Sequence, residues 1–402
     1  MNQYISSKPR YEILDGLRGV AAIIVLLYHH AEIFGPDPLT RGLNHGYLAV
    51  DFFFILSGFV IGYAYDDRWK SAATSTSARM TTWQFFKRRL IRLHPMVIFA
   101  TFFCAAFFYY AWGDLMPLTQ GATPWMVVGA MVCSILMIPM TPGMDIRGWA
   151  ETNPINGNAW TLYYEYLANI LYALVIRHFP KWLLTVFVAC TAVLTLDLTL
   201  NLDLFGFLAN RQHDAYTVVG GWTTNLEQCY VGYVRLLYPF FAGLLISRLM
   251  RNTAIGNGTS PDCKYRGFWV TSLFLALVLV MPRFGGSAES GTALPNGIYE
   301  AVSILLLFPI IVWMGAKSHV TGRSAKICKW LGDISYPLYI THYGLIFGLL
   351  DPWHASHPDA TTGQLIILSI GNIALSIFIA HAALKLYDMP VRKWLTDHWL
   401  KK

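Results

Sequence analysis

An arginine and a histidine lie eleven residues apart in the apolar stretch 11–35, YEILDGLRGVAAIIVLLYHHAEIFG. If this stretch is a helix, Arg18 and His29 point within about 20° of each other and lie about 16 Å apart along one face. Ionisable groups inside a membrane helix are costly and usually mark a functional route. The alternative is that Arg18 extends to the membrane interface while His29 satisfies a carbonyl group of a neighbouring helix. His30 points about a quarter turn away, so the two histidines are not equivalent.

Three more ionisable groups fall inside apolar segments. Asp51 lies near the start of GYLAVDFFFILSG, Glu165 lies in AWTLYYE, and Arg235 lies in YVRLLYPFFAG. The alternative for Asp51 is a carboxylate at a helix start, where the helix dipole favours negative charge. Glu165 and Arg235 are also explained as an acid and a base that neutralise each other within the membrane.

A third histidine follows a serine and a tyrosine in LGDISYPLYITH. Ser335 and Tyr339 are one helical turn apart, and His342 lies about midway into its apolar segment. The alternative role of His342 is a core histidine that is hydrogen-bonded to a neighbouring helix.

The run FFKRRLIRLHP carries four cationic side chains just before an apolar segment. Arg89 and Arg92 are three residues apart, so their guanidinium groups share a helix face, and Arg88 lies beside them. Forked guanidinium donors suit phosphate or carboxylate groups. The alternative is that the run only sets the membrane topology and contacts anionic lipids.

The composition is that of a polytopic membrane protein. Of 402 residues, 55% are hydrophobic and only 13% are charged, and no cleavable signal peptide is evident. The net charge of +7 is spread over short loops and does not indicate a nucleic-acid partner. The six cysteines have no paired or metal-binding spacing, so we expect no structural disulfides and no bound metal.

The distribution of positive charge orients the chain. Ten segments are long and apolar enough to cross a bilayer, namely 13–34, 47–65, 93–112, 160–177, 182–200, 228–248, 267–283, 297–315, 334–350 and 363–386. If the proline-flanked segment 124–140 enters the membrane without crossing it, both termini are cytoplasmic and all but five of the 30 Lys and Arg residues fall inside. We therefore predict an all-α fold with about ten transmembrane helices and one short re-entrant or interfacial segment. A single membrane domain is expected over 1–395, with a cytoplasmic tail over 396–402.

Seven stretches of the sequence together resemble the acyltransferase family 3 membrane O-acyltransferases. They match the family's motifs in order and spacing across about residues 10–395, and they read LDGLRGVAAIIVLLYH, GYLAVDFFFILSGFVI, FFKRRLIRLHP, AWTLYYE, RLLYPFFAG, LGDISYPLYITH and DMPVRKW. Three positions depart from the family pattern: Thr161 replaces a serine, Asp388 replaces a glutamate, and no proline follows His342.

The resemblance implies transfer of an acyl group, most often acetyl, from cytoplasmic acyl-CoA (acetyl-CoA) to a carbohydrate hydroxyl at or beyond the membrane. On this view the phosphates of the donor bind four arginines, which are Arg18, Arg88, Arg89 and Arg92. His29 either deprotonates the hydroxyl group or briefly carries the acyl group. Glu165, Asp51 or His342 orients His29 or stabilises its charged form.

Further residues are candidates for contacts with the substrate. Ser57 and Tyr339 are placed to contact an oxyanion, and Arg235 is a candidate substrate-binding cation. Trp149, Trp160 and Trp222 are candidates for stacking on sugar rings, although tryptophans at membrane interfaces are more often anchors.

Two other functions fit the same residues less well. One is a membrane acyltransferase with a lipid or protein acceptor, and the other is a transporter of small anions. A transporter is disfavoured because we find no internal repeat. We expect the protein to be integral to the cell (inner) membrane and in contact with its lipids.

Overall fold

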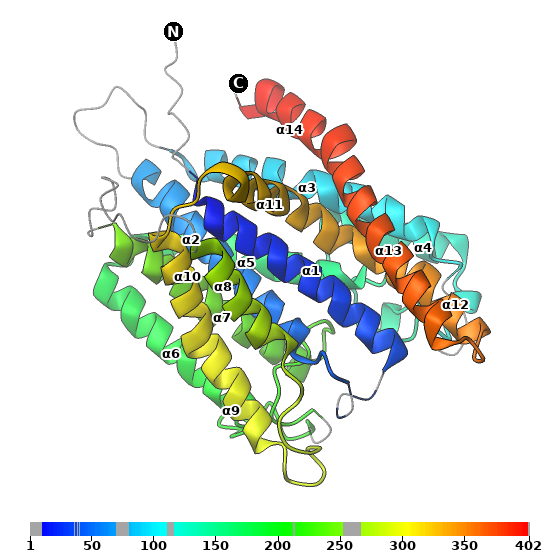
Figure 1. Cartoon of the computed structure of the whole chain (residues 1–402). Coiled ribbons are helices and arrows are strands. Elements are labelled where there is room, and N and C mark those ends of the chain that lie inside the picture. The colour runs from blue at the N-terminus through cyan, green and yellow to red at the C-terminus, as the bar shows by residue number, and fades with distance from the viewer. Residues whose placement is uncertain are drawn as a thin grey trace.

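The computed structural model describes residues 10–35, 37, 39, 41–69, 80–110, 116–211, 214–251 and 267–400. These residues form helices joined by loops and contain no strand. The protein is therefore an all-α polytopic membrane protein, as predicted. Figure 1 shows the helices packed into one bundle, with α1 (Glu12–Phe34) crossing it between α8 and α11.

Seven described helices or helix pairs are long and apolar enough to cross a membrane. Besides α1, these elements are α2 (Ala49–Trp69), α3 (Thr82–Ala106), α6 (Lys181–Thr199), α7 (Leu226–Met250), the pair α9 (Leu294–Val302) with α10 (Phe308–Lys317), and α13 (Thr362–Ala383) with its continuation. The other α-helices are α4 (Pro124–Leu136), α5 (Trp160–Leu174), α8 (Gly267–Val280), α11 (Gly322–Leu345), α12 (Asp351–Ser356) and α14 (Met389–Leu395).

The segment 124–140 forms the short helix α4, which has 13 residues. At the α-helical rise it is about 20 Å long, which is less than the roughly 30 Å of a bilayer core. The helix ends at Met137, whose positive φ of 54° turns the chain away. α8, which lies in an expected crossing segment, has only 14 residues, so the non-crossing path of α4 stays a prediction.

Several helices extend beyond the apolar segments that indicated them. α3 begins at Thr82 behind a capping box formed by Thr81 and Gln84, so the basic run 87–92 is helical. α11 begins at Gly322 instead of near residue 334. The helix after α13 continues to Leu400, so most of the expected tail 396–402 is helical, and residues 401–402 lie outside the described part. Hydropathy detects only the part of a helix that lies in lipid, whereas these helices continue as charged ends.

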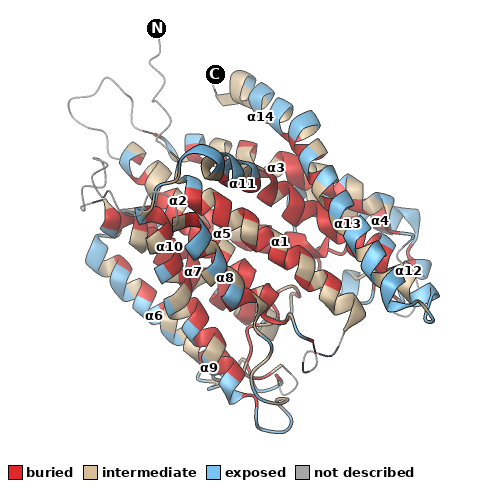
Figure 2. Cartoon of the chain, in the orientation of Figure 1, coloured by how far each residue is buried: buried red, intermediate tan, exposed pale blue. Residues whose placement is uncertain are grey.

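Glycines allow the central helices to approach closely. A Cβ atom on Gly58 of α2 would overlap the carbonyl oxygen of Phe240 in α7, and one on Gly243 would overlap that of Ile55. α1 and α11 meet similarly, because a Cβ atom on Gly19 would overlap the backbone of Leu331. Figure 2 shows the buried residues where the helices face one another, whereas the outer sides of α6, α8 and α13 are exposed. The two close pairs, α2–α7 and α1–α11, form the core that holds the site.

We expect Gly58→Val to destabilise the protein by at least about 1–3 kcal/mol, since the added atoms have no space against the backbone of α7. Thermal unfolding in detergent micelles measures the loss. Gly371→Val in α13 is the matched control, because a Cβ atom there meets nothing within 4 Å. Equal unfolding midpoints for the two variants would contradict the close α2–α7 contact.

Candidate active site

A cavity of about 780 Å³ lies between α1, α2, α3, α5, α11 and the C-terminal helix. It reaches the surface on the face where α1 and α3 begin, where Arg10 and Asp333 line it and are partly exposed. We call this side the basic face, because eight cationic residues line the cavity there: Arg10, Arg18, Arg68, Arg88, Arg89, Arg92, Arg392 and Lys393. α1 ends and α2 begins on the opposite face.

Some of these cations are neutralised by neighbouring carboxylates. The Arg18 guanidinium lies 2.9 Å from the Asp15 carboxylate and donates to the Ser335 hydroxyl at 2.9 Å. Arg89 donates to Glu165 at 2.6 Å. These pairs hold the Arg18 and Arg89 side chains in the cavity wall and occupy some of their N–H donors.

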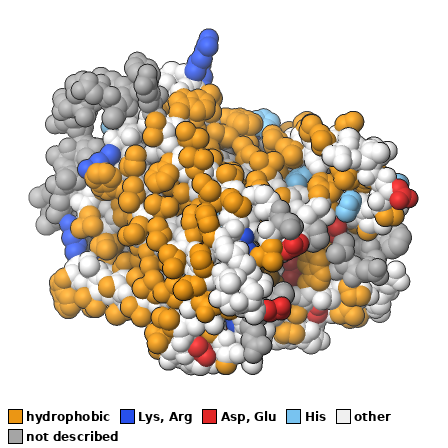
Figure 3. Space-filling model, turned by 60° about the horizontal axis from the view of Figure 1, so that its bottom comes forward, with side chains coloured by type: hydrophobic (Ala, Val, Ile, Leu, Met, Phe, Trp, Pro, Cys, Tyr) orange, Lys and Arg blue, Asp and Glu red, His pale blue; other side chains and the backbone are white. Residues whose placement is uncertain are grey.

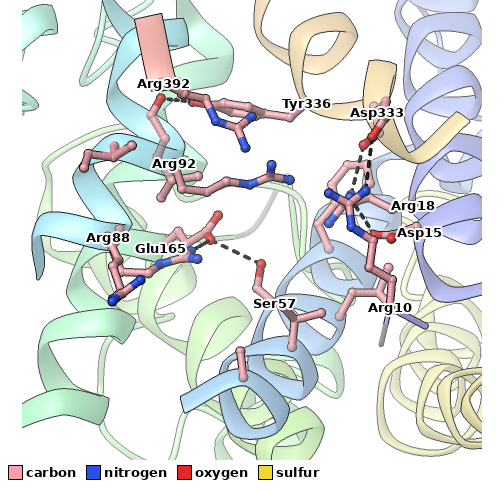
Figure 4. Close-up of a pocket in the computed structure, with 18 of the residues that line it drawn as sticks. Arg10, Asp15, Arg18, Ser57, Arg88, Arg92, Glu165, Asp333, Tyr336 and Arg392 are labelled. Atoms are coloured by element: carbon pink, nitrogen blue, oxygen red, sulfur yellow. Dashed lines mark hydrogen bonds and ion pairs between the residues drawn. The ribbon is translucent and has the colours of Figure 1, made fainter. Parts of the chain in front are cut away.

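Arg88 and Arg92 form no hydrogen bond or ion pair with any described residue. Both guanidinium groups line the cavity, and Arg92 lies between Arg392 and Arg18 (Figure 4). Arg18 and Arg392 are each paired with a carboxylate, Asp15 and Asp388, whereas Arg92 has no ion-pair partner among the described residues. The free guanidinium donors of Arg88 and Arg92 therefore suit a bound anion.

The far end of the cavity is lined by smaller polar groups and rings. The Ser57 hydroxyl donates to Glu165 at 3.3 Å, and the hydroxyls of Thr161 and Tyr339 lie 3.0 Å apart. The ring of Phe53 packs edge-on against Tyr339, with centroids 5.4 Å apart. Of the residues predicted from sequence, Ser57, Glu165 and Tyr339 therefore lie in this cavity together with the four arginines.

His29 does not line the cavity but lies beyond its far end. Its ring is tilted by 31° against that of His342, with centroids 5.3 Å apart, and the His342 ring centroid lies 6.1 Å from that of Tyr339. The rings of Phe53 and Tyr339 line the cavity, and the ring of His342 lies between Tyr339 and His29 in this series of contacts. We call these three rings the aromatic partition.

His29 has a carboxylate partner that the sequence analysis missed. Its Nδ1 donates to a carboxylate oxygen of Glu32 at 2.7 Å, and Arg41 lies 3.3 Å from the other oxygen. With Nδ1 protonated, Nε2 carries the lone pair and makes no hydrogen bond within the described part of the chain. Such a carboxylate–histidine pair orients the ring and fixes which nitrogen carries the proton. The i, i+3 spacing of the two residues was the available signal.

His342 contacts His29 but cannot act as a base in this conformation. Its Nδ1 donates to the carbonyl oxygen of Leu338 at 2.9 Å, and its Nε2 accepts from the Asn158 amide at 3.0 Å. The same amide donates to the carbonyl oxygen of Tyr339 at 3.3 Å, which fixes its orientation. Both ring nitrogens are therefore occupied, and His342 positions His29 by packing.

Asp51 and Arg235 pair with each other instead of meeting His29. Arg235 donates to both carboxylate oxygens of Asp51, at 2.8 and 3.4 Å, and both side chains are almost fully buried. The guanidinium group of Arg235 also lies over the ring of Trp160, 5.3 Å from its centroid. None of these three residues lines the cavity. The expectation that Asp51 orients His29 is not met, because Arg235 occupies its carboxylate.

Glu165 lines the cavity but is likewise not a partner of His29. Arg89 and Ser57 are its side-chain partners, and both come from other helices. Arg392 of α14 is among the lining residues that the sequence analysis missed. It lies in the DMPVRKW stretch and is held by Asp388 at 2.8 Å.

The chain matches a family model described as an acyltransferase domain over residues 11–391. It therefore belongs to the acyltransferase family 3. The fold and the family together identify the protein as a membrane O-acyltransferase.

Three curated relatives were compared with this chain. It is 33% identical over 173 residues to protein 2 in picA locus of Rhizobium radiobacter, which covers 42% of this chain and 83% of that protein. It is 30% identical over 167 residues to the O-acetyl transferase of Shigella phage Sf6, over 41% of this chain and 45% of the relative. It is 24% identical over 399 residues to O-acetyltransferase OatA of Staphylococcus aureus (strain NCTC 8325 / PS 47), over 96% of this chain. The match covers 58% of that relative. No solved structure matches the chain.

The Asp51–Arg235 pair provides a test of structural against chemical roles. Asp51→Ala leaves a buried guanidinium unpaired, and we expect it to destabilise the protein by about 3–5 kcal/mol, measured by thermal unfolding in detergent. The double variant Asp51→Leu/Arg235→Met removes both charges and should recover most of that stability. Acyl transfer by the stable double variant supports a structural pair, whereas a stable but inactive double variant would assign the pair to the chemistry.

Proposed function

We propose that this enzyme transfers an acetyl group from acetyl-CoA, bound in the cavity, to a hydroxyl group of a carbohydrate that approaches from the opposite face. The names of two relatives support an acetyl group and an oxygen acceptor. The carbohydrate acceptor rests on the family resemblance of the sequence motifs. Family membership favours an enzyme over an anion transporter.

The unpaired arginines of the cavity carry the assignment of the donor. Acyl-CoA bears several phosphate groups, and Arg88 and Arg92 offer free guanidinium donors that line the cavity. The long arm of the donor would then follow the cavity inward. Its thioester would lie near Thr161 and Tyr339, next to the aromatic partition.

His29 is the proposed reacting group on the other side of the partition. Its Nε2 takes the proton of the acceptor hydroxyl, and the oxygen attacks the thioester carbonyl carbon. The new C–O bond forms as the C–S bond breaks, and CoA leaves as a thiolate that takes up a proton. In a second route Nε2 attacks the carbonyl itself, and the acyl-imidazole then passes its acyl group to the hydroxyl. In either route Phe53 and Tyr339 must turn aside to bring the thioester to His29.

The orientation belongs to the same proposal. We place the basic face in the cytoplasm and the end of α1 outside, with both termini inside the cell and the protein in the inner membrane. The concentration of Lys and Arg in the loops of the basic face supports this orientation. A lipid or protein acceptor is the alternative that the acceptor assay distinguishes.

His29→Ala should abolish transfer of radiolabelled acetyl from acetyl-CoA to sugar acceptors by the purified protein in nanodiscs. Glu32→Gln should lower kcat by about 10²-fold, since a neutral amide stabilises the imidazolium less than a carboxylate does. His381→Ala, at an exposed position of α13, is the matched control. Rapid quenching of wild-type enzyme with labelled donor tests for the acyl-imidazole. Substantial transfer by His29→Ala would remove His29 from the mechanism.

The double variant Arg88→Ala/Arg92→Ala should raise the KM for acetyl-CoA at least about tenfold, because each phosphate loses a charge-assisted hydrogen bond. The acceptor KM should change little. Arg323→Ala, an exposed arginine that does not line the cavity, serves as the control. An unchanged KM for acetyl-CoA would show that Arg88 and Arg92 do not bind the donor and only set the membrane topology.

A further inference from the structure

One loop on the opposite face is held unusually firmly. Its backbone N–H groups at Arg147, Gly148 and Ala150 all donate to the Asp145 carboxylate, at 2.9, 3.0 and 2.7 Å. Gly148 and Ala150 both have positive φ values, 109° and 52°, and the second is unfavourable for a residue with a Cβ atom. Such a conformation persists only where its surroundings impose it, and this strain clusters at functional sites.

A buried arginine fastens the same loop to α11. The Arg147 side chain is 4% exposed and donates to the Tyr343 hydroxyl at 2.8 Å and to the carbonyl oxygen of Pro154 at 3.2 Å. It also pairs with Glu151 at 3.3 Å. Tyr343 directly follows His342 in α11, so the loop and the ring that packs on His29 are tied to the same helical turn.

These contacts hold one indole ring near the proposed reacting group, with the ring of Phe347 between them. Trp149 is half-buried, and the Arg147 guanidinium lies 5.4 Å from its ring centroid. The ring of Trp149 meets that of Phe347 at 5.5 Å, and Phe347 meets His29 at 5.6 Å. Three rings therefore lie in series, with His29 at one end and a partly exposed indole at the other.

The other candidate tryptophans lack this placement. Trp160 is buried, so its ring is much less accessible than that of Trp149. Trp222 is half-buried, but within the described residues its ring makes no aromatic contact with the cluster around His29. Figure 3 shows acidic and histidine side chains gathered on one side of this face, beside a broad hydrophobic area.

We propose that Trp149 is the platform for the acceptor, against which a sugar ring packs so that one of its hydroxyls reaches His29. An aromatic ring offers a rigid apolar surface to the C–H face of a sugar and leaves the hydroxyls of that sugar in water. This inference rests on the proposed function, and it identifies the acceptor as a ring-shaped carbohydrate instead of a simple alcohol.

The test compares acceptors with and without a ring, using purified protein in nanodiscs with radiolabelled acetyl-CoA. The sugars are tetramers of N-acetylglucosamine, glucose and rhamnose, and glycerol is the alcohol without a ring. Trp149→Leu keeps the apolar volume but loses the flat ring, and should raise the KM for the best sugar about tenfold. It should leave both the KM for glycerol and the KM for acetyl-CoA unchanged. Trp149→Phe should retain most of the sugar affinity, and Trp182→Leu, at an exposed position of α6, is the matched control.

The outcomes separate the platform from the proposed function. An unchanged sugar KM in Trp149→Leu, or an equal rise for sugar and glycerol, would overturn the platform while leaving acyl transfer intact. Wild-type transfer to glycerol but to none of the sugars would overturn the carbohydrate acceptor and the platform together. Absence of any transfer by a folded wild-type protein would overturn the proposed function itself. Thermal unfolding of each variant verifies that the protein is folded.

Discussion

The structure depends on how a bundle in lipid accommodates charge. A buried charge without a partner is far more costly than a paired one, so ionised side chains in such a bundle meet opposite charges. Arg235 meets Asp51, and Arg89 meets Glu165. Arg92 has no such partner among the described residues and faces other cations across a cavity. The exception marks the place where a charge from outside the protein is expected.

α1 links the two halves of the site. It carries Arg18 in the wall of the cavity and His29 beyond the cavity's far end, and its close contact with α11 through Gly19 holds both in register. α11 supplies the rings between them, since Tyr339 lines the cavity while His342 packs against His29. The cavity and the imidazole are therefore positioned by one closely packed pair of helices.

Part of this arrangement was predictable from the sequence because it is local. The helical period determines that Arg18 and His29 share a face, and positive charge combined with hydropathy indicated most of the spanning segments. Glu32 was predictable on the same grounds, since it lies three residues after His29. The predicted acidic partners of His29 were Asp51 and Glu165, which are distant from it in the sequence.

The lateral pairings were not predictable, because they depend on how each helix is rotated against its neighbours. Asp51 and Arg235 are 184 residues apart, and nothing in either motif reveals that they meet. The same holds for Phe53, whose place at the end of the cavity follows from its packing against α11. The full lengths of the helices were also not predictable from hydropathy. α11, for example, begins at Gly322, because its charged first turns precede the apolar segment 334–350.

The aromatic partition has a consequence for proton leakage across the membrane. A water-filled channel that connects both aqueous sides through a histidine can conduct protons. Such a leak would dissipate the membrane potential. Aromatic rings packed at the end of the cavity leave less room for such a column of water. Their packing therefore favours a membrane that keeps its electrical potential.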